Sequence, residues 1–262
     1  MKNRILKITI FGIALCAAVC FSGCGKTVEG LEFVKNLICS CETDVEIEFK
    51  TDQDFDRKVV GLEIPDLPEV FCLDFYDEEV EEWSDYNMHI LSFDITEEGA
   101  EDTCVLTKPL IFHEVIVTWD DGSEIKADIG TIHLTTSDQT QALENWGGEY
   151  MTEGDVVYSE EDIFATEDMI VTDIEIPYSQ DISGILTDLC FGDMPASEIS
   201  EEHPLPLEKG ETYVLTYTLK ETAGHAYGKI FLQGEIKGET TQGKPVLTYF
   251  YVQPPPQKYL TA

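Results

Sequence analysis

The chain has 262 residues, of which 43% are hydrophobic and 10% aromatic, so it can build packed cores and differs from a disordered acidic tail. With 52 acidic and 16 basic residues its formal net charge is −36. A field of this sign repels phosphate backbones and anionic headgroups, which argues against nucleic acid and direct docking on anionic lipid. Cations, basic proteins and neutral glycans stay open as partners, and the alternative interpretation is simply a well-solvated surface.

The first residues of the chain have the pattern of an export signal. Lys2, Arg4 and Lys7 precede an apolar, uncharged run over residues 8–21. This run is too short for a stable membrane-spanning helix, which needs about 20 apolar residues, and small residues close it. The pattern therefore predicts a secretory signal peptide rather than a resident transmembrane anchor.

The end of this signal carries a lipidation motif. Phe21-Ser22-Gly23-Cys24 resembles the lipobox of bacterial lipoproteins, in which Leu, a small residue, and Gly or Ala precede Cys. The resemblance implies that residues 1–23 are removed and that Cys24 carries the lipid, which holds the protein on the extracytoplasmic face of the cell membrane. In that family the lipid has two acyl chains, enough for stable attachment. Phe21 departs from the pattern, and the alternative is an ordinary signal peptide that releases a secreted protein.

Cleavage at this point removes three positive charges and no acidic ones, so the formal charge becomes −39. Residues 24–30 would then form the lipidated N-terminus and a tether.

The rest of the chain has the signature of β-structure. Apolar and polar residues alternate over 45–49, 115–119 and 213–219, and turn residues separate such runs. A hairpin is predicted over 112–134, where Asp121-Gly122 supplies the positive φ angles of a tight turn. Many short strands of this kind predict an all-β fold of two tandem immunoglobulin-like β-sandwich domains.

The boundary between the predicted domains lies in a polar segment. We expect a first β-sandwich over 31–137, a linker over 138–148 and a second β-sandwich over 149–262. Residues 61–65 (Gly-Leu-Glu-Ile-Pro) are echoed by residues 173–177 (Asp-Ile-Glu-Ile-Pro), which is compatible with a duplication. Chance similarity and one large sandwich are the alternatives.

The whole plan, together with residues 118–122 and 128–130, resembles uncharacterised tandem β-sandwich surface lipoproteins of Gram-positive gut bacteria. That resemblance implies a cell-surface location but no ligand and no catalytic residue.

Five cysteines remain after removal of the signal and lipidation of Cys24: Cys39, Cys41, Cys72, Cys104 and Cys190. One or two disulfides among the first four are possible, and free buried thiols are the favoured alternative. The cysteines and histidines lack the paired spacing of a zinc site.

Motifs for nucleophilic or metal-dependent hydrolysis, phosphate binding and dinucleotide binding are missing from the sequence, so we expect no enzyme, no cofactor and no metal. The acidic run over 77–85 could gather oxygens around calcium, but it lacks the spacing of a loop site, and a solvated loop is the simpler interpretation. A hydrolase that uses a carboxylate pair is the least favoured possibility.

The C-terminal part is rich in aromatic residues. Tyr249 and Tyr251 share one strand face, whereas Phe250 takes the other, so the two tyrosines are the candidate ligand-binding residues. The alternative is that they pack in the core. The sequence thus predicts a non-enzymatic, lipid-anchored surface protein that binds an unknown protein or plays a structural part, with glycan capture as the alternative.

Overall fold

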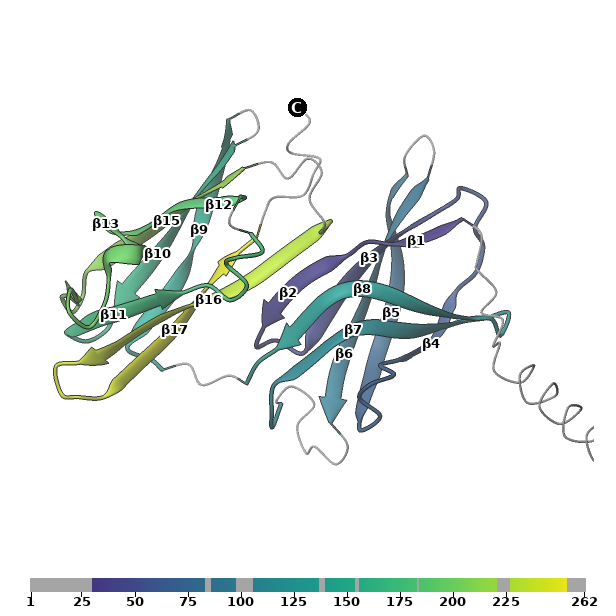
Figure 1. Ribbon diagram of the computed structural model, residues 1–262, viewed down its shortest axis with the longest axis horizontal. Coiled ribbons are helices and arrows are strands. Elements are labelled where there is room, and N and C mark those ends of the chain that lie inside the picture. Colours follow the sequence, from purple (N-terminus) through teal and green to yellow (C-terminus); the bar gives the residue numbers. More distant parts are fainter. Residues whose placement is uncertain are drawn as a thin grey trace, which may run out of the picture.

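The computed structural model describes residues 30–82, 86–97, 106–136, 140–153, 156–182, 184–220 and 227–253, and these residues form two β-sandwiches (Figure 1). The described segments contain no α-helix, and their one short 3₁₀-helix is η1 (Ala196–Glu198). The predicted all-β fold class is confirmed. None of the described segments forms a helix able to span a membrane.

The N-terminal half packs two sheets face to face. Its own sheet, the N-terminal sheet, has the strand order β1 (Leu31–Phe33), β3 (Asp44–Thr51), β6 (Asn87–Glu97), β5 (Val70–Glu82). The facing strands are, in order, β2 (Asn36–Ser40), β8 (Glu124–Leu134), β7 (Leu110–Trp119) and β4 (Val59–Glu63). Strands β1, β3, β6 and β5 follow the A-B-E-D order of immunoglobulin-like domains, and β4, β7 and β8 follow the C-F-G order. Strand β2 is an extra strand beside β8.

The C-terminal half repeats the arrangement. Its own sheet, the C-terminal sheet, has the order β13 (Met194–Pro195), β12 (Leu186–Phe191), β15 (Thr212–Lys220), β10 (Val156–Ala165), β9 (Leu143–Glu153). The facing strands are β14 (Leu205–Leu207), β11 (Met169–Glu175), β16 (Lys229–Thr240) and β17 (Pro245–Val252). Each half has its own hydrophobic core between its two sheets.

The hairpin predicted near residue 121 is confirmed. Strands β7 and β8 pair antiparallel, from Leu110 opposite Leu134 to Thr118 opposite Glu124. Gly122 has a φ of +76°, as the turn requires, and its N–H donates to the carbonyl of Trp119. Because the inward residues of this hairpin are apolar, it forms one wall of the N-terminal core.

Strand β2 joins the two sandwiches into one continuous sheet. It pairs parallel with β8 of its own half and parallel with the first residues of β16 in the other half. Figure 1 shows β2 and β16 side by side where the halves meet. Strand β11 occupies the same edge of β16 further along, and β17 occupies the opposite edge. The long sheet therefore runs from β14 through β2 to β4.

Side chains of β2 alternate between the two cores. Leu37 and Cys39 lie in the C-terminal core, whereas Ile38 lies in the N-terminal core. All five residues of the strand are buried. A strand that is buried on both faces reads as a short continuous apolar run, and period-two alternation cannot show which core each side chain enters.

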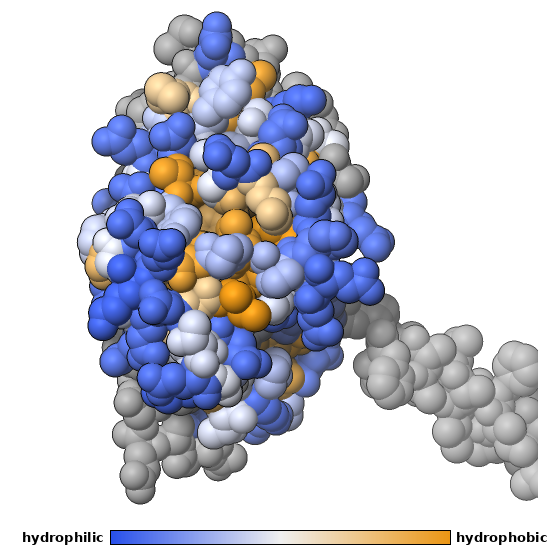
Figure 2. Space-filling view, turned by 90° about the vertical axis from the view of Figure 1, so that its left-hand side faces the viewer, coloured by the Kyte–Doolittle hydropathy of each residue, from blue (hydrophilic) through white to orange (hydrophobic). Residues whose placement is uncertain are grey.

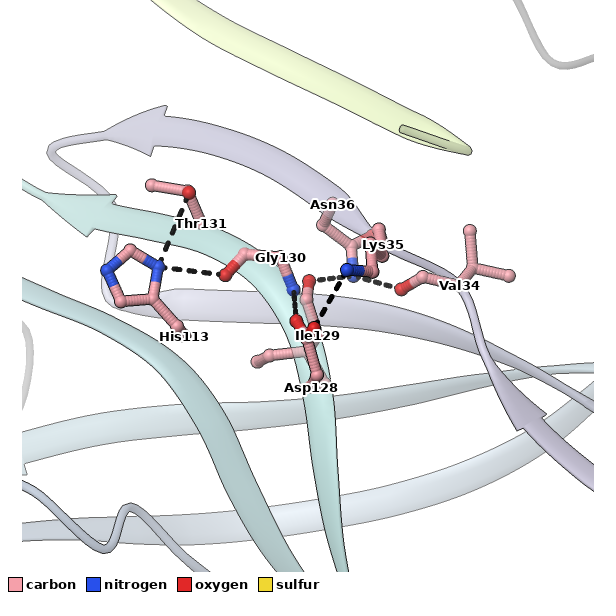
Figure 3. Close-up of polar contacts among 8 residues, drawn as sticks. All are labelled: Val34, Lys35, Asn36, His113, Asp128, Ile129, Gly130 and Thr131. Carbon is pink, nitrogen blue, oxygen red and sulfur yellow. Dashed lines mark hydrogen bonds and ion pairs between the residues drawn. The ribbon is translucent and has the colours of Figure 1, made fainter. Parts of the chain in front are cut away.

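A polar cluster fixes the start of β2 against β8 (Figure 3). The Asn36 side-chain amide donates to the carbonyls of Val34 and Ile129 at 2.9 and 3.0 Å. Lys35 Nζ lies 2.8 Å from the Asp128 carboxylate, whose other oxygen accepts from the N–H of Gly130. Gly130 has a φ of +87°, and a Cβ there would overlap the backbone of Asn36. The two strands can approach this closely because residue 130 has no side chain.

The predicted linker, 138–148, is shorter in the structure. Strand β9 begins at Leu143, which is buried and pairs with Ala165, so residues 143–148 belong to a sheet. The sequence there is polar and glycine-rich because much of this edge strand faces solvent. The Thr140 N–H and hydroxyl also donate to the Leu247 carbonyl, and the Leu247 N–H donates to the Thr140 hydroxyl. The division into domains at this point stays a prediction.

Candidate binding surface

The two predicted ligand-binding tyrosines lie in β17, and the expectation that both face solvent is wrong for Tyr249. Its side chain is 4% exposed, and Phe250 on the opposite strand face is fully buried in the C-terminal core. Residues on both faces of β17 are buried, and one edge of the strand lies beside β9, from which Asn145 Nδ2 donates to the Tyr249 carbonyl at 3.3 Å. Tyr249 therefore presents no ring face to a ligand.

Tyr251 is half-buried at the junction of the two halves. Its ring stacks on Phe231 of β16, with 5.3 Å between ring centroids. Burial, with a smaller contribution from the Glu42 carboxylate, raises the pKa of Tyr251 to about 12. Both contacts place it in the packing between the halves, and its role in ligand binding stays a prediction.

The proposed lipidation site, Cys24, lies outside the described residues, as does Cys104. The four cysteines that the structure describes, Cys39, Cys41, Cys72 and Cys190, are free thiols. The acidic run over 77–85 lies only partly within the described residues, and among those residues no group of three or more His, Cys, Asp and Glu could hold a metal ion.

One cysteine lies beside a histidine, as in a nucleophilic site. Cys39 Sγ is 3.7 Å from His133 Nδ1, and the Tyr178 hydroxyl lies 3.2 Å from the same nitrogen. Burial raises the pKa of Cys39 to about 12 and lowers the pKa of His133. The thiol is therefore protonated and the imidazole neutral at neutral pH, so this cluster supplies no thiolate nucleophile. Its effect is to pack β2 and β8 against the C-terminal half.

The outer face of the C-terminal sheet carries exposed apolar side chains that sequence reasoning did not single out. In β10 the residues 157, 163 and 165 point into the core, so residues 158, 160, 162 and 164 project outward. Register places Met151 of β9 beside Tyr158, and Thr218 of β15 on its other side. We call this face, with its apolar and acidic side chains, the outer face.

Two apolar groups lie on the outer face, one toward each end of β10. At one end Trp146, 57% exposed, stacks on Phe164 with 4.3 Å between centroids and an interplanar angle of 14°. The indole Nε1 donates to the Glu144 carboxylate at 3.1 Å, which fixes the ring plane. At the other end Tyr158 and Met151 are both exposed. Large exposed aromatic and sulfur side chains of this kind are typical of interaction surfaces.

Between these apolar groups the outer face is acidic. Glu160 of β10 lies directly opposite Glu149 of β9, and Asp162 follows on the same face of β10. These three carboxylates form no ion pair with any residue that the structure describes. Figure 2 shows the whole side of the molecule that lies at the left in Figure 1, a wider surface than this row of residues, with apolar side chains gathered near its centre and hydrophilic ones around them.

Only the part of the outer face that β10 contributes could have been predicted from the sequence. The run over 156–165 alternates, so Tyr158, Glu160, Asp162 and Phe164 could have been assigned to one strand face. Their partners on β9 could not, because the register shifts between Glu161 and Ile163 and moves Trp146 next to Phe164.

Comparison with known proteins gives only distant likenesses. No protein-family model matches the chain, and no curated protein matches it. Among solved structures, a protein of unknown function from Porphyromonas gingivalis W83 is 11% identical with a TM-score of 0.27, and the match covers 86% of this chain and 100% of that chain.

Two bacterial adhesins also match. The Enterococcus faecalis MSCRAMM ACE, described as binding its ligands by the collagen Hug model, is 11% identical with a TM-score of 0.26, covering 87% of this chain and 95% of that chain. The collagen adhesin CNA of S. aureus is 8% identical with a TM-score of 0.18, covering 86% and 93%. At these TM-scores the likenesses carry no argument about this chain.

Proposed function

We propose that the chain is a non-enzymatic, lipid-anchored binding protein of the cell surface and that the outer face is its binding surface. The observation that carries the proposal is the pair of apolar groups on the outer face, Trp146 with Phe164 and Tyr158 with Met151, in which Trp146, Tyr158 and Met151 are exposed. Tryptophan and tyrosine give large contact areas at low entropic cost, and they dominate the binding energy of interfaces.

Ligand binding by the parent chain, a variant of this surface and a control variant tests the proposal. The parent chain, the double variant Trp146→Ala/Tyr158→Ala, and Tyr76→Ala would be screened against arrays of glycans and of extracellular proteins. Tyr76 is the matched control because it is an exposed tyrosine on the N-terminal half. We expect ligands that bind the parent and Tyr76→Ala to lose roughly thirtyfold or more in affinity on the double variant. Equal binding to all three proteins would show that the outer face is not the binding surface.

Glycan capture is the second candidate function. The exposed indole of Trp146 offers a flat apolar surface of the kind on which sugar rings stack, and Glu144 and Glu149 could accept hydrogen bonds from hydroxyls. In this alternative the ligand would be neutral, since acidic glycans meet the same repulsion as nucleic acid. A hit confined to neutral glycans and lost in Trp146→Ala would favour it over a protein ligand.

The membrane anchor is tested through Cys24. Because acylation and cleavage both require the cysteine thiol in the lipoproteins that the motif resembles, Cys24→Ala should leave an uncleaved precursor or release the protein from the membrane fraction. Fractionation of cells and the mass of the purified chain measure both outcomes. Correctly cleaved Cys24→Ala protein that stays in the membrane fraction would rule out the lipid anchor.

A further inference from the structure

The chemistry of the outer face indicates which kind of partner it takes, on the premise that this face is the binding surface proposed above. Along β10 the outward side chains follow the order aromatic, acidic, acidic, aromatic: Tyr158, Glu160, Asp162, Phe164. Successive members are about 7 Å apart, and the row spans roughly 20 Å, because a strand rises about 3.3 Å per residue. Met151, Glu149 and Trp146 of β9 broaden the same pattern sideways.

The centre of this row has unbalanced negative charge. Glu149 and Glu160 face each other across an antiparallel pair, an arrangement in which like charges destabilise a sheet. The register places one cation, Lys220, on this face of the described strands, and it lies beyond Tyr158 opposite Val156. Carboxylates that repel each other and have no cation beside them favour a bound positive charge.

We infer that the outer face binds an extended basic segment of another protein, with two Arg or Lys side chains flanked on each side by an apolar one. The basic side chains would lie between Glu149, Glu160 and Asp162, and the apolar ones would cover Tyr158 and Phe164. An arginine at the end near Trp146 also stacks on the exposed indole, whose face attracts cations.

Spacing and charge favour this occupant over others. Side chains of an extended peptide project to one side every second residue, about 7 Å apart, which matches the outward row of β10. An anionic lipid or polysaccharide would place like charge on the acidic centre, and a neutral sugar would leave those carboxylates without a counter-charge.

The test uses the full chain and synthetic peptides. The probe has the pattern Leu-Thr-Arg-Thr-Arg-Thr-Leu, in which Leu, Arg, Arg and Leu share one face. Control peptides exchange the Arg and Leu positions or replace Arg with Glu, and a neutral hexasaccharide is the glycan probe. Protein variants are Glu160→Gln, Trp146→Ala and, as a charge-matched control on an exposed position of β8, Glu124→Gln.

The protein variants should differ in their affinity for the basic probe according to where each substitution lies. We expect Glu160→Gln to weaken binding roughly three- to tenfold and Trp146→Ala roughly tenfold or more, whereas Glu124→Gln has no effect beyond about twofold. Affinity should also fall as salt rises, and the exchanged and Glu-containing peptides should bind less tightly.

Several results would overturn the inference. Absence of probe binding, or equal weakening by Glu160→Gln and Glu124→Gln, would mean that the outer face does not recognise a basic segment. Hexasaccharide binding that Trp146→Ala abolishes would also overturn it while leaving the proposed binding surface intact. If Trp146→Ala changes the binding of no ligand found for the parent chain, the proposed surface itself fails.

Discussion

At the scale of single residues, the contact between Asn36 and Gly130 decides how closely β2 approaches β8. Asn36 is fully buried, and its amide nitrogen donates to two carbonyls. Gly130 takes a backbone conformation that other residues adopt only with strain, and its missing side chain leaves room for the Asn36 backbone. The close pairing of β2 with β8 therefore depends on one glycine.

Replacing this glycine should destabilise the protein more than replacing a glycine in an open turn. For Gly130→Ala we expect a loss of roughly 2–4 kcal/mol in the free energy of unfolding, from both φ strain and overlap with Asn36. Gly122→Ala is the matched control, because Gly122 also has a positive φ but no atom lies near its missing Cβ. It should cost about 1 kcal/mol. Equal losses in denaturant unfolding of the two variants would contradict the close contact.

Glu161 is a buried carboxylate inside the C-terminal half, and it should make stability depend on pH. It accepts from Asn145 Nδ2 at 2.7 Å and from the Tyr251 N–H, yet burial outweighs these bonds and raises its pKa above the ordinary 4.5. Because the folded state holds the proton more tightly than the unfolded state, this contribution to stability is complete below the unfolded-state pKa. It is lost as the pH rises through the folded-state pKa.

The variant Glu161→Gln removes this titration. We therefore expect the unfolding free energy of the parent, relative to that of the variant, to fall as the pH rises above about 4.5. Denaturant unfolding of both proteins from pH 4 to pH 8 measures the difference. A constant difference between the two proteins across this range would contradict the raised pKa of Glu161.

At the scale of elements, β2 contributes to two cores at once. Leu37 lies beside Ile230 of β16 and belongs to the C-terminal core, whereas Ile38 lies beside Ile132 of β8 in the N-terminal core. Adjacent residues of one five-residue strand thus stabilise different halves of the molecule.

Truncation of each of these two neighbours should disturb the core of a different half of the molecule. Leu37→Ala and Ile38→Ala should each cost roughly 2–4 kcal/mol of stability, because each removes a buried aliphatic side chain. In methyl NMR spectra, Leu37→Ala should shift resonances of Ile230 and Leu232, and Ile38→Ala those of Ile132 and Leu134. If both variants shifted the same set of methyl groups, β2 would not be shared in this way.

Local patterns in the sequence predicted the elements better than their surroundings. The Asp-Gly turn and the alternation on either side of it gave the β7–β8 hairpin, because turn chemistry and side-chain period are local properties. The same period placed Tyr249 and Tyr251 on one face and Phe250 on the other. It could not show that Tyr249 is buried or that Tyr251 stacks on Phe231 of β16, since burial and that contact depend on the assembled sheets.

At the scale of the whole molecule, the sequence predicted two sandwiches but not the sheet that connects them. Strand β2 pairs in parallel with β16, which lies about 190 residues later in the chain. No turn or spacing pattern in the sequence predicts such a pairing. The candidate surface was missed for a different reason, because Trp146 and Phe164 meet only after the register shift between the consecutive strands β9 and β10.

The continuous sheet predicts that both halves unfold together. Opening either sandwich removes β2 from one of its two neighbours and exposes Leu37, Ile38 or Cys39, so neither half should keep its full core when the other unfolds. Variants with one tryptophan can report on each half. Trp119 is buried in the N-terminal core, and Trp146 lies on the C-terminal sheet.

We expect the denaturation midpoints of Trp83→Phe/Trp146→Phe and of Trp83→Phe/Trp119→Phe to coincide with the circular dichroism transition of the same protein. Leu37→Ala added to each should lower both midpoints, although Leu37 belongs to the C-terminal core and Trp119 to the other. A shift of the Trp146 transition alone would show that the halves unfold independently and that the β2–β16 pairing contributes little coupling between them.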